Sequence, residues 1–122
     1  MQLYCKKCNH KLTALELQQA SYNEAKMEDQ APLIGRGFYI NAGEIDFHFG
    51  KPIDFLVNKE SVLLQNHKDV MRLQGCCGPG DLNVLNQVCP NCSAEIGVIF
   101  ADCWLPHFIG ISADTVSQDP VW

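Results

Sequence analysis

Four cysteines at two widely separated places have the spacing of a metal site. Cys5 and Cys8 form one Cys-x-x-Cys pair, and Cys89 and Cys92 form another in the last third of the chain. Structural zinc takes four ligands in a tetrahedron, and two Cys-x-x-Cys pairs supply such a set. We therefore predict one structural Zn²⁺, held by these four thiolates, that joins the two ends of the domain.

Two other interpretations of the pairs stay open. Each pair could be a separate redox dithiol, or its thiols could be ordinary buried side chains. A thioredoxin-like pair follows a strand, starts a helix and has a first cysteine of low pKa. Lys6 and Lys7 would lower a thiol pKa, but no helix-starting pattern follows Cys8. The sequence therefore favours zinc over a redox pair.

A second group of residues could also do chemistry, and it consists of Cys76, Cys77, Cys103 and His107. The group could hold a second metal ion or provide a catalytic cysteine–histidine pair. Neighbouring side chains on extended backbone point to opposite sides, which makes a joint site for Cys76 and Cys77 difficult. Packed thiols are the simpler interpretation, because free cysteine is among the most buried residue types.

Four other residues have a structural interpretation that is favoured. Asp46 and His48 fall on one side of an expected strand, where a solvated face is favoured over an acid/base pair. His10 is expected to be a solvated turn residue, because four cysteines already fill the metal shell. Trp104 is expected to anchor the core at a C-terminal bend.

The composition limits the class of protein. A chain of 122 residues fits one domain, which is small enough for a metal ion to matter to its stability. The net charge of -5, from 9 basic and 14 acidic residues, disfavours binding of nucleic acid and favours a basic protein partner. No apolar run reaches the ~18 residues of a membrane span. The odd cysteine count and the lack of a signal-peptide pattern predict a reducing, cytoplasmic location.

Short strands dominate the expected secondary structure. Alternating or apolar runs bounded by turn residues predict strands over residues 2–4, 38–40, 45–49, 55–57, 95–100 and 108–111. One face of the strand over residues 95–100 should carry Ile96, Val98 and Phe100. Capping patterns at Thr13, Ser21 and Asn58 predict short helices within residues 14–30 and 58–65.

These elements predict one zinc-stabilised domain of the α+β class that is rich in β-structure. A knuckle over residues 3–10 and a second knuckle with C-terminal strands over residues 84–116 would clamp the insertion over residues 11–83. That insertion would contain a small sheet and short helices, in a zinc-ribbon-like arrangement. Residues 117–122 would form a tail ending in Val121 and Trp122, for which a docked or a contacting role is open.

Three motifs carry a resemblance to a known family: Gly75-Cys76-Cys77-Gly78, Asn86-Gln87-Val88-Cys89 and Asp102-Cys103-Trp104-Leu105-Pro106-His107. Together with the Cys-x-x-Cys start, they resemble a family of small, mostly uncharacterised bacterial cytoplasmic proteins. The resemblance covers the first knuckle and residues 72–106, and the loop at residues 78–81 departs from the family's usual Gly-x-Asp-Gly. It implies a role like that of immunity-type proteins encoded beside polymorphic toxins.

Two classes of function follow. The first is a non-enzymatic binding protein, most concretely an immunity protein that neutralises a toxin by covering its basic domain. The acidic charge, which would speed capture, and the closed metal site favour this class. The second is a thiol- or metal-dependent enzyme or redox protein that uses Cys76, Cys77, Cys103 or His107 in an open cleft.

Overall fold

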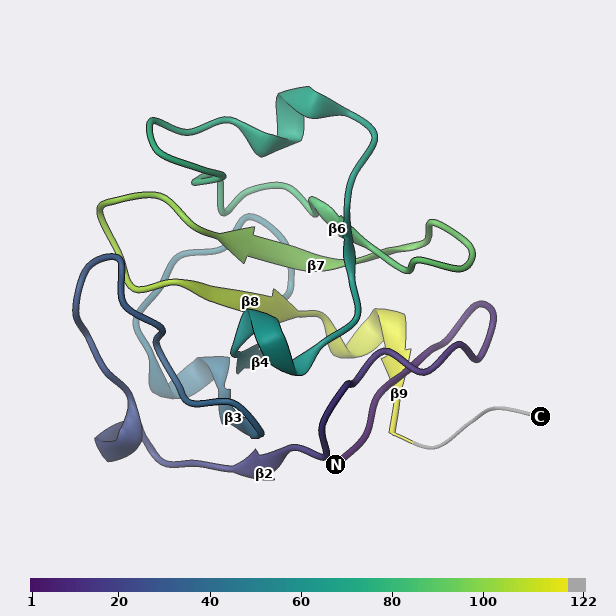
Figure 1. Cartoon of the computed structure of the whole chain (residues 1–122), viewed down its shortest axis with the longest axis horizontal. Helices are drawn as coiled ribbons and strands as arrows, with labels where there is room; N and C mark the ends of the chain where they lie inside the picture. Colours follow the sequence, from purple (N-terminus) through teal and green to yellow (C-terminus); the bar gives the residue numbers. More distant parts are fainter. Residues whose placement is uncertain (119–122) are drawn as a thin grey trace.

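The computed structural model describes residues 1–118 as short strands joined by long connections (Figure 1). Helical structure in the described residues is limited to single 3-10 turns: η1 (Tyr22–Glu24), η2 (Ala42–Glu44), η3 (Lys59–Ser61), η4 (Val70–Leu73) and η5 (Ala113–Thr115). No helix in this part of the chain is long and apolar enough to cross a membrane. The predicted richness in β-structure is confirmed, and the expected tail residues Val121 and Trp122 lie outside the described residues.

Seven strands form one mixed sheet in the order β2-β3-β4-β8-β7-β6-β5. Their bounds are β2 (Gln18–Gln19), β3 (Phe38–Asn41), β4 (Phe55–Val57), β5 (Gln65–Asn66), β6 (Gln87–Val88), β7 (Glu95–Phe100) and β8 (Phe108–Ile111). The pair β2–β3 is parallel, and the other neighbours are antiparallel. A separate antiparallel pair joins β1 (Tyr4–Cys5) to β9 (Val116–Ser117), which places the first and last described strands side by side.

The predicted strands over residues 38–40, 55–57, 95–100 and 108–111 are confirmed by β3, β4, β7 and β8. The strand predicted over residues 45–49 is wrong, because these residues pair with no strand in the described part of the chain. Their alternation has another cause. Phe47 stacks on Phe108 with ring centroids 5.1 Å apart, and Phe49 meets the same ring edge-on at 6.0 Å.

The helix expected from the Thr13 pattern does not form. Thr13 pairs with Val62 in an isolated bridge, and its hydroxyl accepts a hydrogen bond from the Leu3 N–H at 3.3 Å. Leu12 and Leu17 are both buried in one hydrophobic cluster, which an extended segment satisfies. Tertiary packing therefore overrides the local capping signal here.

The other two capping patterns each produce a single 3-10 turn. The Ser21 N–H donates to the Glu24 carboxylate at 2.8 Å, as a capping box requires, but η1 contains no buried residue and ends after one turn. Asn58 accepts the Glu60 N–H at 2.8 Å and starts η3. Neither turn extends into a helix: η1 has no apolar face to pack, and after η3 the backbone becomes extended at Val62, which is buried in the core.

Buried hydrophobic residues form two clusters, and consecutive residues of β8 enter different ones. Phe108 belongs to one cluster, and Ile109 belongs to the other. Since neighbouring side chains of a strand point to opposite faces, the clusters lie on opposite faces of the sheet. The cluster that contains Cys5 and Cys89 is called the cysteine-side cluster below.

A β-bulge in β7 decides which cluster Ile96 enters. Gln87 of β6 lies opposite Gly97, and the next residue of β6 lies opposite Glu95, so Ile96 is an extra residue in β7. Ile96 packs in the cysteine-side cluster, whereas the other cluster receives Val98 and Phe100. The prediction that these three residues share one face is therefore wrong, and the bulge is the reason.

The contact between β7 and β8 yields a test of this packing. A Cβ atom at Gly97 would overlap the carbonyl oxygen of Gly110 on the adjacent strand. We predict that Gly97→Ala lowers the free energy of unfolding by about 1–3 kcal/mol, as overpacking does, in urea titrations. Gly43→Ala is the matched control, because a Cβ there meets no atom within 4 Å. Equal losses in both variants would contradict the packing described.

Candidate metal centre

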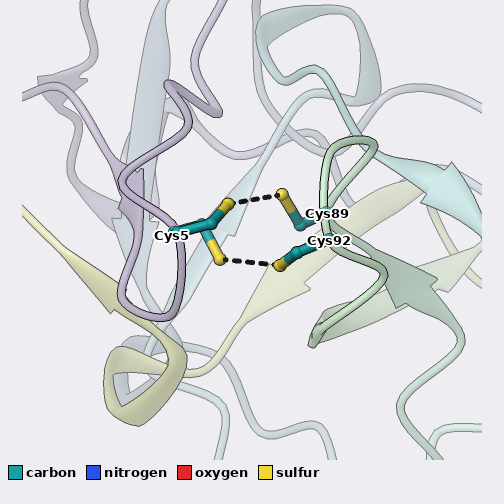
Figure 2. Close-up of side chains that lie close together, drawn as sticks. Cys5, Cys89 and Cys92 are labelled. Atoms are coloured by element: carbon teal, nitrogen blue, oxygen red, sulfur yellow. Dashed lines mark hydrogen bonds between the residues drawn. The ribbon is translucent and has the colours of Figure 1, made fainter.

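The structure brings the four predicted cysteines together from the two ends of the fold. Sγ of Cys5 lies 3.6 Å from Sγ of Cys92, and Sγ of Cys8 lies 3.7 Å from Sγ of Cys89 (Figure 2). All four sulfur atoms lie within 4.8 Å of one another. Metal–sulfur bonds of about 2.3 Å in a tetrahedron require sulfur–sulfur separations of about 3.8 Å. The geometry is therefore compatible with one metal ion bound by four thiolates.

The two cysteine turns have the same backbone geometry. In the first, the Cys5 N–H donates to the His10 carbonyl at 2.8 Å, and the Asn9 N–H donates to the Cys5 carbonyl at 2.8 Å. In the second, the Cys89 N–H donates to the Ala94 carbonyl, and a Ser93 N–H donates back to Cys89, both at 2.9 Å. Each turn thus presents its two sulfur atoms in the same way.

A left-handed residue follows the second cysteine of each turn. Asn9 has φ 63° and Ser93 has φ 64°, a conformation that residues other than glycine seldom adopt. The conformation reverses the chain directly after Cys8 and Cys92. Because the same strained backbone conformation occurs at the equivalent position of both turns, we infer that it helps to shape the cysteine site.

The thiols of the centre lie in different electrostatic environments. Burial raises the pKa of Cys5 to about 12 and also raises the pKa of Cys89. A hydrogen bond from the Asn91 side chain lowers the pKa of Cys8 to about 6. A buried thiol of raised pKa becomes a thiolate when a cation binds to it, so the two buried sulfurs suit a metal ion.

The second predicted group is assembled only in part. Cys77 and Cys103 come together with the carboxylate of Asp102, with their ligand atoms within 4.8 Å of one another. The thiols of Cys103 and then Cys76 raise the pKa of Cys77 to about 11. His107 does not join these thiols, because its Nε2 lies 3.0 Å from the backbone carbonyl oxygen of Asp102.

Asp102 anchors the Gly-Cys-Cys-Gly loop, a role that the sequence analysis missed. Its buried carboxylate accepts the N–H groups of Cys76 at 3.1 Å, Cys77 at 3.0 Å and Cys103 at 2.7 Å. These N–H groups, with that of Cys77 first, lower the pKa of Asp102. A Cβ at Gly75 would lie 2.7 Å from this carboxylate, so the close approach requires glycine. The only sequence signal was the position of Asp102 beside Cys103.

The four remaining candidate residues are all exposed. Trp104 is 54% exposed and meets the ring of Phe100 edge-on at 4.9 Å, so the prediction of a core anchor is wrong. Asp46 and His48 are exposed and line a shallow hollow beside Trp104. His10 is an exposed turn residue, as predicted.

Comparison with known proteins found no matching family model, no matching curated protein and no matching solved structure. The resemblance to the family of small bacterial cytoplasmic proteins therefore stays a prediction.

Loss of one ligand tests whether the centre holds the fold. We predict that Cys92→Ser removes the bound metal and lowers the free energy of unfolding by more than about 4 kcal/mol, as loss of a structural metal does. Metal content by elemental analysis and unfolding by circular dichroism measure both effects. Cys76→Ser is the matched control, because Cys76 is exposed and outside the centre. Normal stability of the Cys92 variant would contradict a structural role.

Proposed function

We propose that this chain is a zinc-stabilised protein-binding domain without catalytic activity, and that it acts in the cytoplasm as an immunity protein that binds and neutralises a toxin. One Zn²⁺ at Cys5, Cys8, Cys89 and Cys92 would hold its two knuckles together in a zinc-ribbon-like manner. The observation that carries the proposal is the hydrogen-bonded turn η4, which exposes two adjacent apolar side chains, Val70 and Met71.

The choice of zinc rests on the donor set. Four cysteine thiolates in a tetrahedral arrangement are a ligand set of structural Zn²⁺. The sulfur separations of 3.6 and 3.7 Å fit a site in which every coordination position is taken by the protein. Such a closed site has no position for a substrate, which supports a structural use of the ion.

The proposed binding surface is the exposed tip of η4. Val70 is 67% and Met71 is 70% exposed, the highest values among the large hydrophobic residues in the part of the chain that is described. The turn is capped at both ends: Asp69 accepts the Met71 N–H at 3.1 Å, and Gln74 donates to the Val70 carbonyl at 3.3 Å. Val70 and Met71 are adjacent, and exposed apolar side chains that lie together mark contact sites more often than isolated ones do.

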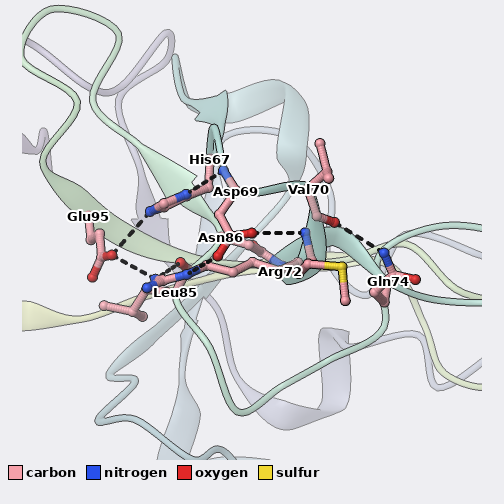
Figure 3. Close-up of polar contacts among 9 residues, drawn as sticks. His67, Asp69, Val70, Arg72, Gln74, Leu85, Asn86 and Glu95 are labelled. Atoms are coloured by element: carbon pink, nitrogen blue, oxygen red, sulfur yellow. Dashed lines mark hydrogen bonds and ion pairs between the residues drawn. The ribbon is translucent and has the colours of Figure 1, made fainter.

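A network of charged and polar groups fixes this turn to the sheet (Figure 3). Arg72 donates to the Glu95 carboxylate at 2.6 Å and to the Leu85 carbonyl at 3.0 Å. Glu95 also lies 3.1 Å from Nε2 of His67, whose Nδ1 accepts the Asp69 N–H at 2.9 Å. Since the turn is held in one conformation, a partner would bind it with little loss of conformational entropy.

The charge indicates the kind of partner. At a net charge of -5, the protein attracts basic surfaces, and such attraction raises association rates. A basic toxin domain meets this requirement and agrees with the resemblance to immunity-type proteins. The apolar pair at η4 would then supply the desolvated centre of the contact.

Two observations weigh against a thiol-dependent enzyme. The raised pKa of Cys77, about 11, keeps its thiol protonated near neutral pH and hence weakly nucleophilic. His107, the candidate base, contacts the carbonyl oxygen of Asp102. Neither residue has the setting of an activated cysteine–histidine pair.

Proton release tests the zinc assignment. Cys5 and Cys89 have raised pKa values, so both must lose a proton when zinc binds at pH 7. We predict that zinc binding releases at least about two protons and weakens as the pH falls, because protons compete for the thiolates. Isothermal titration calorimetry in buffers of different ionisation enthalpy measures this release. An enthalpy that does not depend on the buffer would contradict thiolate ligation.

The binding proposal predicts a specific loss of protection. Cells that express the chain should survive the toxin domain encoded beside its gene, and Val70→Ser/Met71→Ser should weaken binding by at least about tenfold, or 1.4 kcal/mol. Surface plasmon resonance with that toxin domain measures affinity, and the association rate should fall with salt.

Met27→Ser is the matched control for this test, because Met27 is also exposed, at 49%, and lies outside η4. It should bind and protect as the wild type does. A chain without a neighbouring toxin gene, or equal binding by all variants, would contradict the proposal.

A further inference from the structure

A second group of side chains with metal-binding chemistry lies outside the centre at Cys5, Cys8, Cys89 and Cys92. Sγ of Cys77, Sγ of Cys103 and a carboxylate oxygen of Asp102 lie within 4.8 Å of one another. The set is graded in exposure: Cys77 is exposed, Cys103 is half-buried and Asp102 is buried. One side of the set is therefore open to solvent, unlike the centre at Cys5 and Cys89.

Asp102 brings the two thiols together. Its Oδ1 accepts hydrogen bonds from the backbone N–H of Cys77 at 3.0 Å and from that of Cys103 at 2.7 Å. The backbones of both cysteines are therefore held by one oxygen atom. Its Oδ2 accepts the N–H of Cys76 at 3.1 Å. A carboxylate oxygen has two lone pairs, so Oδ2 keeps the capacity to bind a cation.

The backbone of the loop holds this arrangement in place. The Gly80 N–H donates to the Gln74 carbonyl at 2.9 Å, and the Ala101 N–H donates to the Pro79 carbonyl at 2.8 Å. These bonds fasten the loop that carries Cys77 to the end of β7. The ligand atoms are thus positioned by parts of the fold that need no metal ion for their contact.

We propose that Cys77, Cys103 and Asp102 form a second zinc site, which is open and exchangeable. Two thiolates and one carboxylate are ligands that Zn²⁺ accepts, and an ion held by three protein ligands keeps one position for water or an outside ligand. The carboxylate argues against a purely thiophilic ion such as Cu(I), which prefers sulfur. The tetrathiolate centre would hold its zinc permanently, and this site would gain and lose zinc with supply.

The test uses the full chain loaded with excess zinc and then dialysed. Native mass spectrometry should find a second equivalent of zinc in addition to the ion bound by Cys5, Cys8, Cys89 and Cys92. A chromogenic chelator should remove the second equivalent in a fast phase with no change in circular dichroism, and the first in a slow phase with unfolding. A single equivalent in the wild type would overturn the proposal.

Variants locate the second ion. Cys77→Ser, at an exposed position, should lose the second equivalent and the fast phase but keep the first equivalent and the thermal unfolding transition. Met27→Ser is the control, since Met27 is also exposed and lies outside the loop that carries Cys76 and Cys77, and it should keep both ions. Persistence of the second ion in the Cys77 variant, or its loss in the control, would overturn the assignment.

Cobalt substitution gives an independent readout. In the wild type, the second equivalent of Co²⁺ should add a smaller sulfur-to-cobalt absorption than the first, because two thiolates bind it in place of four. In Cys77→Ser, this second increment should disappear. An increment equal to the first would contradict a mixed thiolate and carboxylate site.

Discussion

Convergence of four sulfur atoms is the constraint on which this fold depends. The chain has short strands and single 3-10 turns, and therefore little local structure that is stable alone. Cys5 and Cys89 carry the constraint into the interior, since both are buried in the cysteine-side cluster. An ion between the two turns would stabilise the thiolates and would join the turn at Cys5 and Cys8 to the turn at Cys89 and Cys92. Without it, two protonated thiols would remain in a hydrophobic cluster.

The two cysteine groups lie near opposite ends of β7. On the cysteine side, the bulge at Ile96 directs an apolar side chain toward the turns that carry the sulfurs. The far end of β7 leads to Asp102, which holds the exposed Gly-Cys-Cys-Gly loop. β7 thus runs from the four converging cysteines at one end to the group of Cys77, Cys103 and Asp102 at the other, and the two groups differ in burial and in donor atoms.

Sequence spacing was sufficient to predict that the four cysteines converge and where the longest strands lie. The Cys-x-x-Cys pairs named all four converging cysteines, because the ligand spacing of a turn is a local property. Strands β7 and β8 were predictable from their apolar runs and bounding turns. The helix prediction at Thr13 was wrong for a physical reason: Thr13 has a capping pattern, but Leu12 and Leu17 on either side of it pack into the core while Thr13 pairs with Val62 in a β-bridge.

What the sequence could not indicate depends on contacts between distant residues. Asp102 anchors a loop that is more than two dozen residues away in the chain, through N–H groups that every residue type has. His107 seemed to belong with the cysteines, but its ring contacts a backbone carbonyl. Trp104 remains 54% exposed although tryptophan is usually well buried. None of these three contacts or exposures could be predicted from the order of residue types along the chain.

X-ray absorption at the zinc edge tests the central claim most directly. The protein would be loaded with a single equivalent of zinc, so that only the tighter centre is filled. Four cysteine ligands predict a first shell of four sulfur atoms at about 2.3 Å, with no nitrogen or oxygen near 2.0 Å. A shell that contains nitrogen or oxygen, or fewer than four sulfur atoms, would contradict a closed centre formed by Cys5, Cys8, Cys89 and Cys92.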